Sequence, residues 1–243
     1  MQLGGPRTDQ PAPTDVAAAI TTGAATLGHR PAVTVLHRQA RYEQSGTSLV
    51  NWAAKGAHLL ELDHLVGPGA TVRLLAPPCW TSASVALATW WLGGTVALTA
   101  GEPDGVSIGH PSQIGAQEAG HSDLLLGDGL DGAPSPDDLT ATTTGIPAWT
   151  HEAQPLPDHP PTAQARGDLP ALRTASQTWS QAELLAVAGA LGEGTLGIEA
   201  GTTDHLTALA AVSLRPLLTG HATVVLRGVP RGAAAAERVT TWI

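Results

Sequence analysis

The stretch that decides the fold runs from Thr47 to Ala100 and reads TSLVNWAAKGAHLLELDHLVGPGATVRLLAPPCWTSASVALATWWLGGTVALTA. Its first part places apolar residues at helical spacing between Leu49 and Leu60, which predicts one helix with one buried face. After the Gly-Pro-Gly break, the pattern predicts a strand, an apolar helix and a second strand, at 71–76, 80–92 and 95–99. Two strands joined by a helix pair in parallel through a right-handed crossover. The stretch therefore predicts a parallel sheet in an α/β protein.

The flanking regions extend this alternation in both directions. Upstream, Asp15 is placed to cap a helix that continues to about Leu27, and the run AVTVLH (32–37) is β-branched enough to form a strand. Downstream, Ser180 and Glu183 form a capping box in front of a helix. Further strands are predicted at 123–126, 171–174 and 222–226, and a further helix after 203–204. We expect the strands at 71–76, 95–99 and 123–126 to be neighbours in a mainly parallel sheet.

The organisation of the chain follows from its prolines and glycines. Residues 1–13 are rich in proline, glycine and polar side chains, which predicts a flexible N-terminal tail. Residues 127–170 hold eight of the 19 prolines, which predicts loops and short edge strands there. Residues 14–243 are expected to form a single α/β domain, either as one unit or as two lobes joined by the stretch 127–170.

Composition and charge limit the class of protein. The 243 residues carry 12 basic and 21 acidic side chains, a formal charge of −9, which argues against nucleic acid because its binding needs cations opposite phosphates. Apolar residues make up 42% of the chain, which is enough to form a core. No apolar run reaches the roughly 18 residues of a membrane helix. Together with the single cysteine, Cys79, and the lack of a signal-peptide pattern, this predicts a cytoplasmic protein that binds neither nucleic acid nor membranes.

Several motifs match known signatures but stand in the wrong context. The glycines at 127–132 fit G-x-G-x-x-G, yet prolines follow where a dinucleotide-binding helix should begin. A second match at 192–197 follows a helix instead of a strand. The segment GVSIG (105–109) fits the G-x-S-x-G of serine hydrolases, but a His-Pro pair follows it where the helix should open. We interpret these as chance matches, and a hydrolase or transferase that uses Ser107 stays open as an alternative.

Other reactive side chains do not form a recognisable site. The ten histidines include no pair at the i, i+4 spacing that places two imidazoles on one ion, so no metal is expected. Cys79 lies between a strand and a helix, where we interpret it as a small buried residue. Lys55, the single lysine, points to the side of the buried helix face and is expected to be solvated and not catalytic. No catalytic residue is assigned.

Four motifs are spaced as in one enzyme family. They are GPGATV (67–72), GGTVAL (93–98), GDLPAL (167–172) and PLLTGHATVVL (216–226). In that order they resemble the G-x-x-x-G-D-x-V turn, the A-G-A-x-x-V-P-L strand, the D-x-A-x-L segment and the P-L-x-x-G-A-x-x-V-L segment of the adenylate-forming superfamily, which includes the acyl-CoA synthetases. Ala70 stands where the family usually has Asp. The resemblance spans most of residues 30–226 and implies a mostly parallel sheet flanked by helices, like the N-terminal part of such an enzyme.

The phosphate loop of that family is where the chain departs most. The loop, T-S-G-T-T-G-x-P-K-G, uses glycines to turn N–H groups toward a triphosphate, hydroxyls to bond its oxygens and a lysine for charge. At the matching place the chain reads RTASQTWS (173–180), with hydroxyls but without glycine or lysine. The resemblance implies a remnant site at Thr174, Ser176 and Thr178. The family's later motifs and its small C-terminal domain with the catalytic Lys would lie beyond Ile243.

These departures predict a truncated acyl-CoA synthetase-like protein without adenylation activity, which acts as a module that binds a small molecule or a protein. No cofactor is expected, and ATP or AMP would bind only weakly at the remnant loop. A first alternative is a split acyl-activating ligase that a second polypeptide completes. A second alternative is an unrelated hydrolase or transferase on the same scaffold. A protein partner or a homo-oligomer is compatible with each interpretation.

Overall fold

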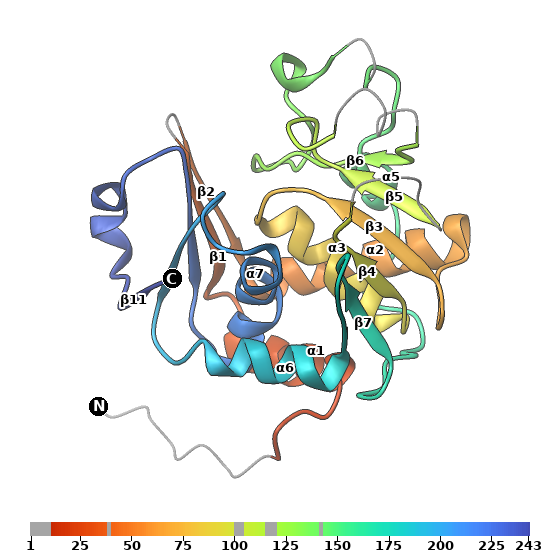
Figure 1. Cartoon of the computed structure of the whole chain (residues 1–243), viewed down its shortest axis with the longest axis horizontal. Coiled ribbons are helices and arrows are strands. Elements are labelled where there is room, and N and C mark those ends of the chain that lie inside the picture. Colours follow the sequence, from red (N-terminus) through yellow and green to blue (C-terminus); the bar gives the residue numbers. More distant parts are fainter. Residues whose placement is uncertain (1–10, 38–39, 100–104, 115–120, 141–142) are drawn as a thin grey trace.

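The computed structural model of the chain arranges its helices between and around two β-sheets (Figure 1). The structure describes residues 11–37, 40–99, 105–114, 121–140 and 143–243. The predicted flexible tail falls largely on residues 1–10, which lie outside the described residues. Within the described ranges the helices are α1 (Val16–Leu27), α2 (Gly46–His64), α3 (Trp80–Trp91), α5 (Trp149–Ala153), α6 (Gln181–Ala190) and α7 (His205–Thr219), with the 3-10 helices η1 (Pro136–Asp138) and η2 (Arg231–Glu237).

The first sheet combines strands from both halves of the chain. Its order among the described residues is β11-β9-β10-β1-β2, where the strands are β1 (Pro31–His37), β2 (Ala40–Ser45), β9 (Leu196–Glu199), β10 (Thr223–Arg227) and β11 (Thr241–Trp242). The first four run parallel, and β2 returns antiparallel along β1. The sequence predicts β1 and β10 but not the others. As an edge strand β2 is polar (ARYEQS), β9 (LGIE) contains a glycine and a glutamate, and β11 has only two residues, so none of them shows an apolar strand pattern.

The second sheet contains the strands of the deciding stretch. Its order among the described residues is β6-β5-β3-β4-β7-β8, where the strands are β3 (Thr71–Leu75), β4 (Thr95–Ala97), β5 (Val106–Gly109), β6 (Leu124–Leu125), β7 (Pro170–Arg173) and β8 (Thr178–Ser180). All pairings are parallel except the β7–β8 hairpin, which confirms the mainly parallel sheet. The expectation that 123–126 neighbours 71–76 is wrong, because β5 lies between β3 and β6. The run VSIG of β5 contains a serine and ends at a glycine, so its pattern does not distinguish it from a loop.

Between the sheets, α1, α2, α3 and α7 share one apolar core. Every residue of α3 from Trp80 to Trp90 is buried, so this helix is covered on all sides. On α2, Gly56 faces the ring of Trp149, and a Cβ built on this glycine would lie 2.2 Å from the ring atom Cζ2. The small residue therefore lets the indole approach the helix backbone. Among the described residues, no helix combines the length and apolar character that crossing a membrane requires.

Part of the proline-rich stretch 127–170 lies against α2 and α3. The Lys55 Nζ donates to Gln154 O at 2.9 Å and forms an ion pair with Asp158 at 2.7 Å. The indole of Trp91 also donates to a carbonyl of this stretch. The Lys55 side chain is only 19% exposed, so the expectation that it is solvated is wrong. The helix pattern cannot reveal this, because the covering residues lie about a hundred positions further along the chain.

Candidate ligand-binding site

A polar cleft lies at the carboxyl ends of strands from both sheets. It has a volume of about 490 Å³, and its walls include His37 and Arg227, the last residues of β1 and β10, and Ala76, which follows β3. His205, the first residue of α7, stands at the same cleft. Ligands of α/β proteins usually bind at the carboxyl ends of parallel strands, where side chains and helix N-termini converge. This position makes the cleft the candidate site.

A small apolar recess adjoins the cleft. Its volume is about 50 Å³, and it shares Ala76, Pro78, Gln113 and His205 with the cleft. Its remaining walls are mostly aliphatic and include Leu74, Leu75, Leu98, Ala208 and Leu209. A polar compartment next to an apolar one matches a small molecule with a polar head and a short apolar group.

The residues that line the cleft differ in charge from the chain as a whole. The described lining residues include Arg227, His37 and His205 but no Asp or Glu, whereas the whole chain carries a formal charge of −9. At the N-terminus of helix α7 the carboxylate of the N-cap Asp204 accepts from Thr207 N at 2.9 Å, so it already uses the positive end of the helix dipole. With one arginine, two histidines and no Asp or Glu among its described lining residues, the cleft favours an anionic group over a cationic one.

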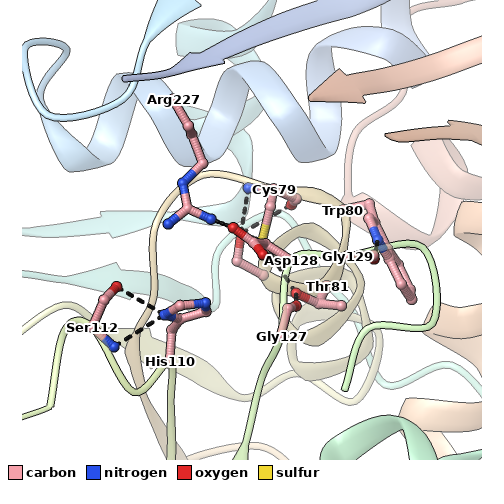
Figure 2. Close-up of polar contacts among 10 residues, drawn as sticks. Cys79, Trp80, Thr81, His110, Ser112, Gly127, Asp128, Gly129 and Arg227 are labelled. Carbon is pink, nitrogen blue, oxygen red and sulfur yellow. Dashed lines mark hydrogen bonds and ion pairs between the residues drawn. The ribbon is translucent and has the colours of Figure 1, made fainter. Parts of the chain in front are cut away.

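Arg227 forms an ion pair with Asp128, drawn in Figure 2. The two side chains are 17% and 23% exposed, so most of the pair is shielded from water. Arg227 ends β10 in the first sheet and Asp128 follows β6 in the second, so the pair connects the two sheets. Burial lowers the pKa of Arg227, but from a starting value so high that the guanidinium stays charged.

The first turn of α3 holds the loop that carries Asp128. Thr81 Oγ1 donates to Gly127 O at 2.7 Å, and Trp80 Nε1 donates to Gly129 O at 2.8 Å. The chain continues as a loop into the single turn η1 and does not open an α-helix. The glycines at this place therefore shape a loop that positions a carboxylate, and the interpretation of G-x-G-x-x-G as a chance match is confirmed.

His110 lies below the ion pair in Figure 2 and is 2% exposed. The Ser112 N–H donates to its Nδ1 at 3.1 Å, and the Ser112 hydroxyl lies 2.8 Å from the same nitrogen. Because Nδ1 accepts, the neutral ring carries its proton on Nε2. Burial, and to a smaller extent the charge of Arg227, lower the pKa of His110 to about 4. The Nε2 atom is buried and has no hydrogen-bond partner among the described residues.

Ser107 and Cys79, the two candidate nucleophiles, are both buried and hold the fold together. Ser107 lies inside β5, is 1% exposed, and its hydroxyl accepts a hydrogen bond from Arg73 Nε at 2.8 Å. A G-x-S-x-G nucleophile must stand on an exposed turn, so this match is a chance one. Cys79 is the fully buried N-cap of α3, with its Sγ 3.1 Å from Thr81 Oγ1, which confirms its interpretation as a small buried residue. In the part of the chain that the structure describes, no group of three or more His, Cys, Asp or Glu is placed to hold a metal ion.

Thr174, Ser176 and Thr178 lie at the turn of the β7–β8 hairpin and do not line the cleft or its recess. The Thr174 N–H donates to Gln177 O at 2.9 Å, and the N–H groups of Ser176 and Gln177 donate to Thr174 Oγ1 at 3.4 and 3.3 Å. None of the described residues with positive φ belongs to this turn. The N–H groups are thus engaged within the turn itself, and a nucleotide site at these residues stays a prediction.

The residues of the cleft carry no motif, and no signature in the sequence singles them out. His37 ends the run AVTVLH and Arg227 directly follows ATVVL, so both stand at the end of a predicted strand. Parallel strands place such ends at one edge of their sheet, and this is the signal that would have identified them. The sequence does not indicate that two separate sheets present these edges to one cleft.

Comparison with known proteins gives a limited match in sequence. No protein-family model matches the chain. A protein of Mycobacterium tuberculosis, described as a TIGR03089 family protein, is 40% identical over 58 residues, which are 24% of this chain and 24% of that protein. The two chains are therefore of similar length, and their similarity covers about a quarter of each.

Known structures match more of the chain. Coronafacic acid ligase from Pectobacterium brasiliense matches with a TM-score of 0.66 and 12% identity, over 88% of this chain and 46% of the ligase. A fatty acyl CoA synthetase from Mycobacterium tuberculosis matches with a TM-score of 0.66 and 14% identity, over 93% of this chain and 48% of the synthetase. The chain spans about half the length of these enzymes. It has the fold of the N-terminal part of acyl-CoA synthetases, with parallel sheets flanked by helices.

Proposed function

We propose that this chain is a ligase-like protein that binds small carboxylic acids in the cleft and does not adenylate them. The observation that carries the proposal is a cleft with Arg227 and two histidines, and no Asp or Glu among its described lining residues, beside an apolar recess. The carboxylate would lie near Arg227 and His205, and its apolar chain would enter the recess. The recess volume of about 50 Å³ favours short acyl chains.

The names of the structural relatives support this class of ligand. One relative is a ligase named for an acid, coronafacic acid, and another is a synthetase named for fatty acyl groups. The present chain corresponds to less than half of either protein. Binding of the acid is a function that half of the fold can retain, because the cleft is built entirely from this chain.

The turn at 174–178 supports the lack of adenylation. A triphosphate is bound by a row of N–H groups turned outward and by a nearby cation. In this turn three N–H groups are used internally, and neither glycine nor lysine is present. We therefore expect ATP and AMP to be weak ligands at most, and no cofactor to be required.

Titration of ¹⁵N-labelled protein with butyrate tests the proposal. We expect saturable chemical-shift changes at Gln113, His205 and Arg227, which line the cleft. His205→Ala should weaken binding at least threefold, whereas His151→Ala, which changes an exposed histidine of α5, should not alter it. Absence of saturation at tens of millimolar butyrate, or equal effects of the two variants, would contradict the proposal.

The split-ligase alternative also has an observation in its favour, since the chain matches 46% and 48% of two longer ligases. A second polypeptide, or a second copy in a homo-oligomer, would then supply the missing part of the site. The test is ATP–pyrophosphate exchange with the chain alone and with proteins that copurify with it. Exchange that needs a copurified protein would replace the binding-module proposal. For either function we propose a cytoplasmic location, which the free thiol of Cys79 supports.

A further inference from the structure

Two polar groups at or near the wall of the cleft, the guanidinium of Arg227 and the Nε2–H of His110, differ in whether they have a partner among the described residues. Arg227 lines the cleft, but its ion pair with Asp128 neutralises the charge that it would offer to an anion. Below the pair, the Nε2–H of His110 is buried without a partner among the described residues. Leaving a buried donor unsatisfied costs free energy, and a state that satisfies it is favoured by a factor of about five or more. Asp128 thus competes with a ligand for Arg227, while the nearby Nε2–H of His110 has no acceptor among the described residues.

The surroundings of His110 determine which group can use this donor. The charged and titratable side chains drawn around it in Figure 2 are Arg227 from β10, Asp128 from the loop after β6, and Cys79 at the start of α3. Its own loop contributes Ser112, which engages Nδ1 on the other side of the ring. Among these groups Asp128 has the only carboxylate. Asp128 also lines a second, open hollow of about 610 Å³, so its side chain is not enclosed on every side.

We propose that Asp128 sets the affinity of the cleft through an exchange of partners, in which a ligand carboxylate takes Arg227 from Asp128 and Asp128 then accepts the Nε2–H of His110. This inference rests on the proposed function. In the exchanged state Arg227 is paired with the ligand, and the buried donor of His110 is satisfied. Asp128 and His110 contact no ligand atom and act as positioning residues for Arg227.

The exchange also makes the cleft selective for anions. A carboxylate can replace another carboxylate on a guanidinium, because both offer two charged oxygens to the same donors. A neutral amide of the same shape cannot compete with Asp128 on these terms. Butyrate should therefore bind at least tenfold more tightly than butyramide, which has the same carbon chain.

Binding of butyrate to four variants of the full chain tests the exchange. Asp128→Asn removes the competing charge and should lower the Kd for butyrate at least fivefold. Asp131→Asn, an exposed aspartate in the same loop, is the matched control and should leave the Kd unchanged. His110→Phe removes the donor that Asp128 needs after the exchange and should raise the Kd at least fivefold, whereas His110→Gln, which keeps an ε-nitrogen donor, should restore part of the loss.

The double variant Asp128→Asn, His110→Phe separates the exchange from a general loss of structure. With the charge at 128 removed, His110→Phe should change the Kd less than twofold, so the two effects are not additive. In the unsubstituted chain, butyrate should move the His110 Nε2–H signal downfield in ¹H–¹⁵N spectra, as expected for a new bond to a carboxylate. That signal reports the exchange directly, even where a variant is less stable.

The outcomes distinguish the inference from the proposed function. If butyrate binds the unsubstituted chain but Asp128→Asn leaves the Kd within twofold and the His110 signal does not move, the exchange is wrong and the binding function stands. If neither the unsubstituted chain nor Asp128→Asn binds butyrate, the proposed function fails and the exchange fails with it. Binding that appears only in Asp128→Asn would show that the ligand cannot take Arg227 from Asp128, which contradicts both the exchange and the proposed function.

Discussion

Replacing Gly56 with alanine tests how closely α2 approaches Trp149. Inside a helix, Gly→Ala normally stabilises a protein by about 1 kcal/mol, because glycine loses more backbone entropy on folding. At this position the new Cβ would lie 2.2 Å from Cζ2 and 2.6 Å from Cη2 of Trp149, whose side chain is fully buried. Overpacking of this kind costs about 1–3 kcal/mol. Since 2.2 Å is far inside van der Waals contact, we use the upper end and expect a net loss of about 2 kcal/mol.

Gly189 of α6 provides the matched control. A Cβ on this exposed helical glycine meets nothing within 4 Å, so Gly189→Ala should stabilise the chain by about 0.5–1 kcal/mol. Thermal unfolding followed by circular dichroism measures both variants. At about 2–4 °C per kcal/mol for a chain of this size, Tm should fall by about 4–8 °C for Gly56→Ala and rise by about 1–4 °C for Gly189→Ala. Shifts of the same sign would refute the argument, and Trp149→Phe should recover part of the loss in a Gly56→Ala background.

Three further predictions concern Lys55, His110 and the hairpin turn. Lys55→Met should reduce the free energy of unfolding by about 1–2 kcal/mol, measured by urea denaturation. This value is kept low because the partner Asp158 is 62% exposed, which weakens the ion pair. A loss below about 0.5 kcal/mol would show that the contacts of Lys55 do not stabilise the fold. The pKa of His110 is lowered to about 4 from its ordinary 6.5, so the unfolded chain takes up the proton first and stability should fall as pH drops from 6.5 to 4, by up to about 3 kcal/mol. His110→Phe should flatten that part of the pH profile, and an unchanged profile would count against the assignment. Millimolar ATP with magnesium should shift Tm by less than about 1 °C, whereas a saturable shift of several degrees that Ser176→Ala and Thr178→Ala abolish would establish a nucleotide site.

Local signals in the sequence were sufficient for most helices. Asp15 accepts from Ala18 N at the start of α1, and Ser180 and Glu183 form the expected capping box in front of α6. These interactions join residues three positions apart, so the sequence contains all the information that they need. The strands β1, β3, β4, β7 and β10 were predictable for a related reason, because each is a mostly apolar or β-branched run close to turn residues.

Short strands depended on their neighbours instead. Four residues form β5 and four form β9, and neither run differs enough from a loop to be recognised. Each is a strand because the backbone of an adjacent strand offers it hydrogen-bond partners, as Val72 to Leu75 of β3 do for β5. The polar strand β2 exists for the same reason, since β1 provides its ladder. Pairing between distant segments decided these elements, and no local pattern contains it.

The candidate site shows the same division. The sequence by itself determined that His37 and Arg227 end apolar strands, that glycines surround Asp128, and that the loop at 174–178 lacks glycine and lysine. Only the tertiary structure decided that Arg227 of one sheet meets Asp128 of the other, and that His110 is buried beneath them. The physical reason is that side-chain periodicity reports which face of an element is buried, whereas the packing of two sheets through shared helices decides which strand ends come together.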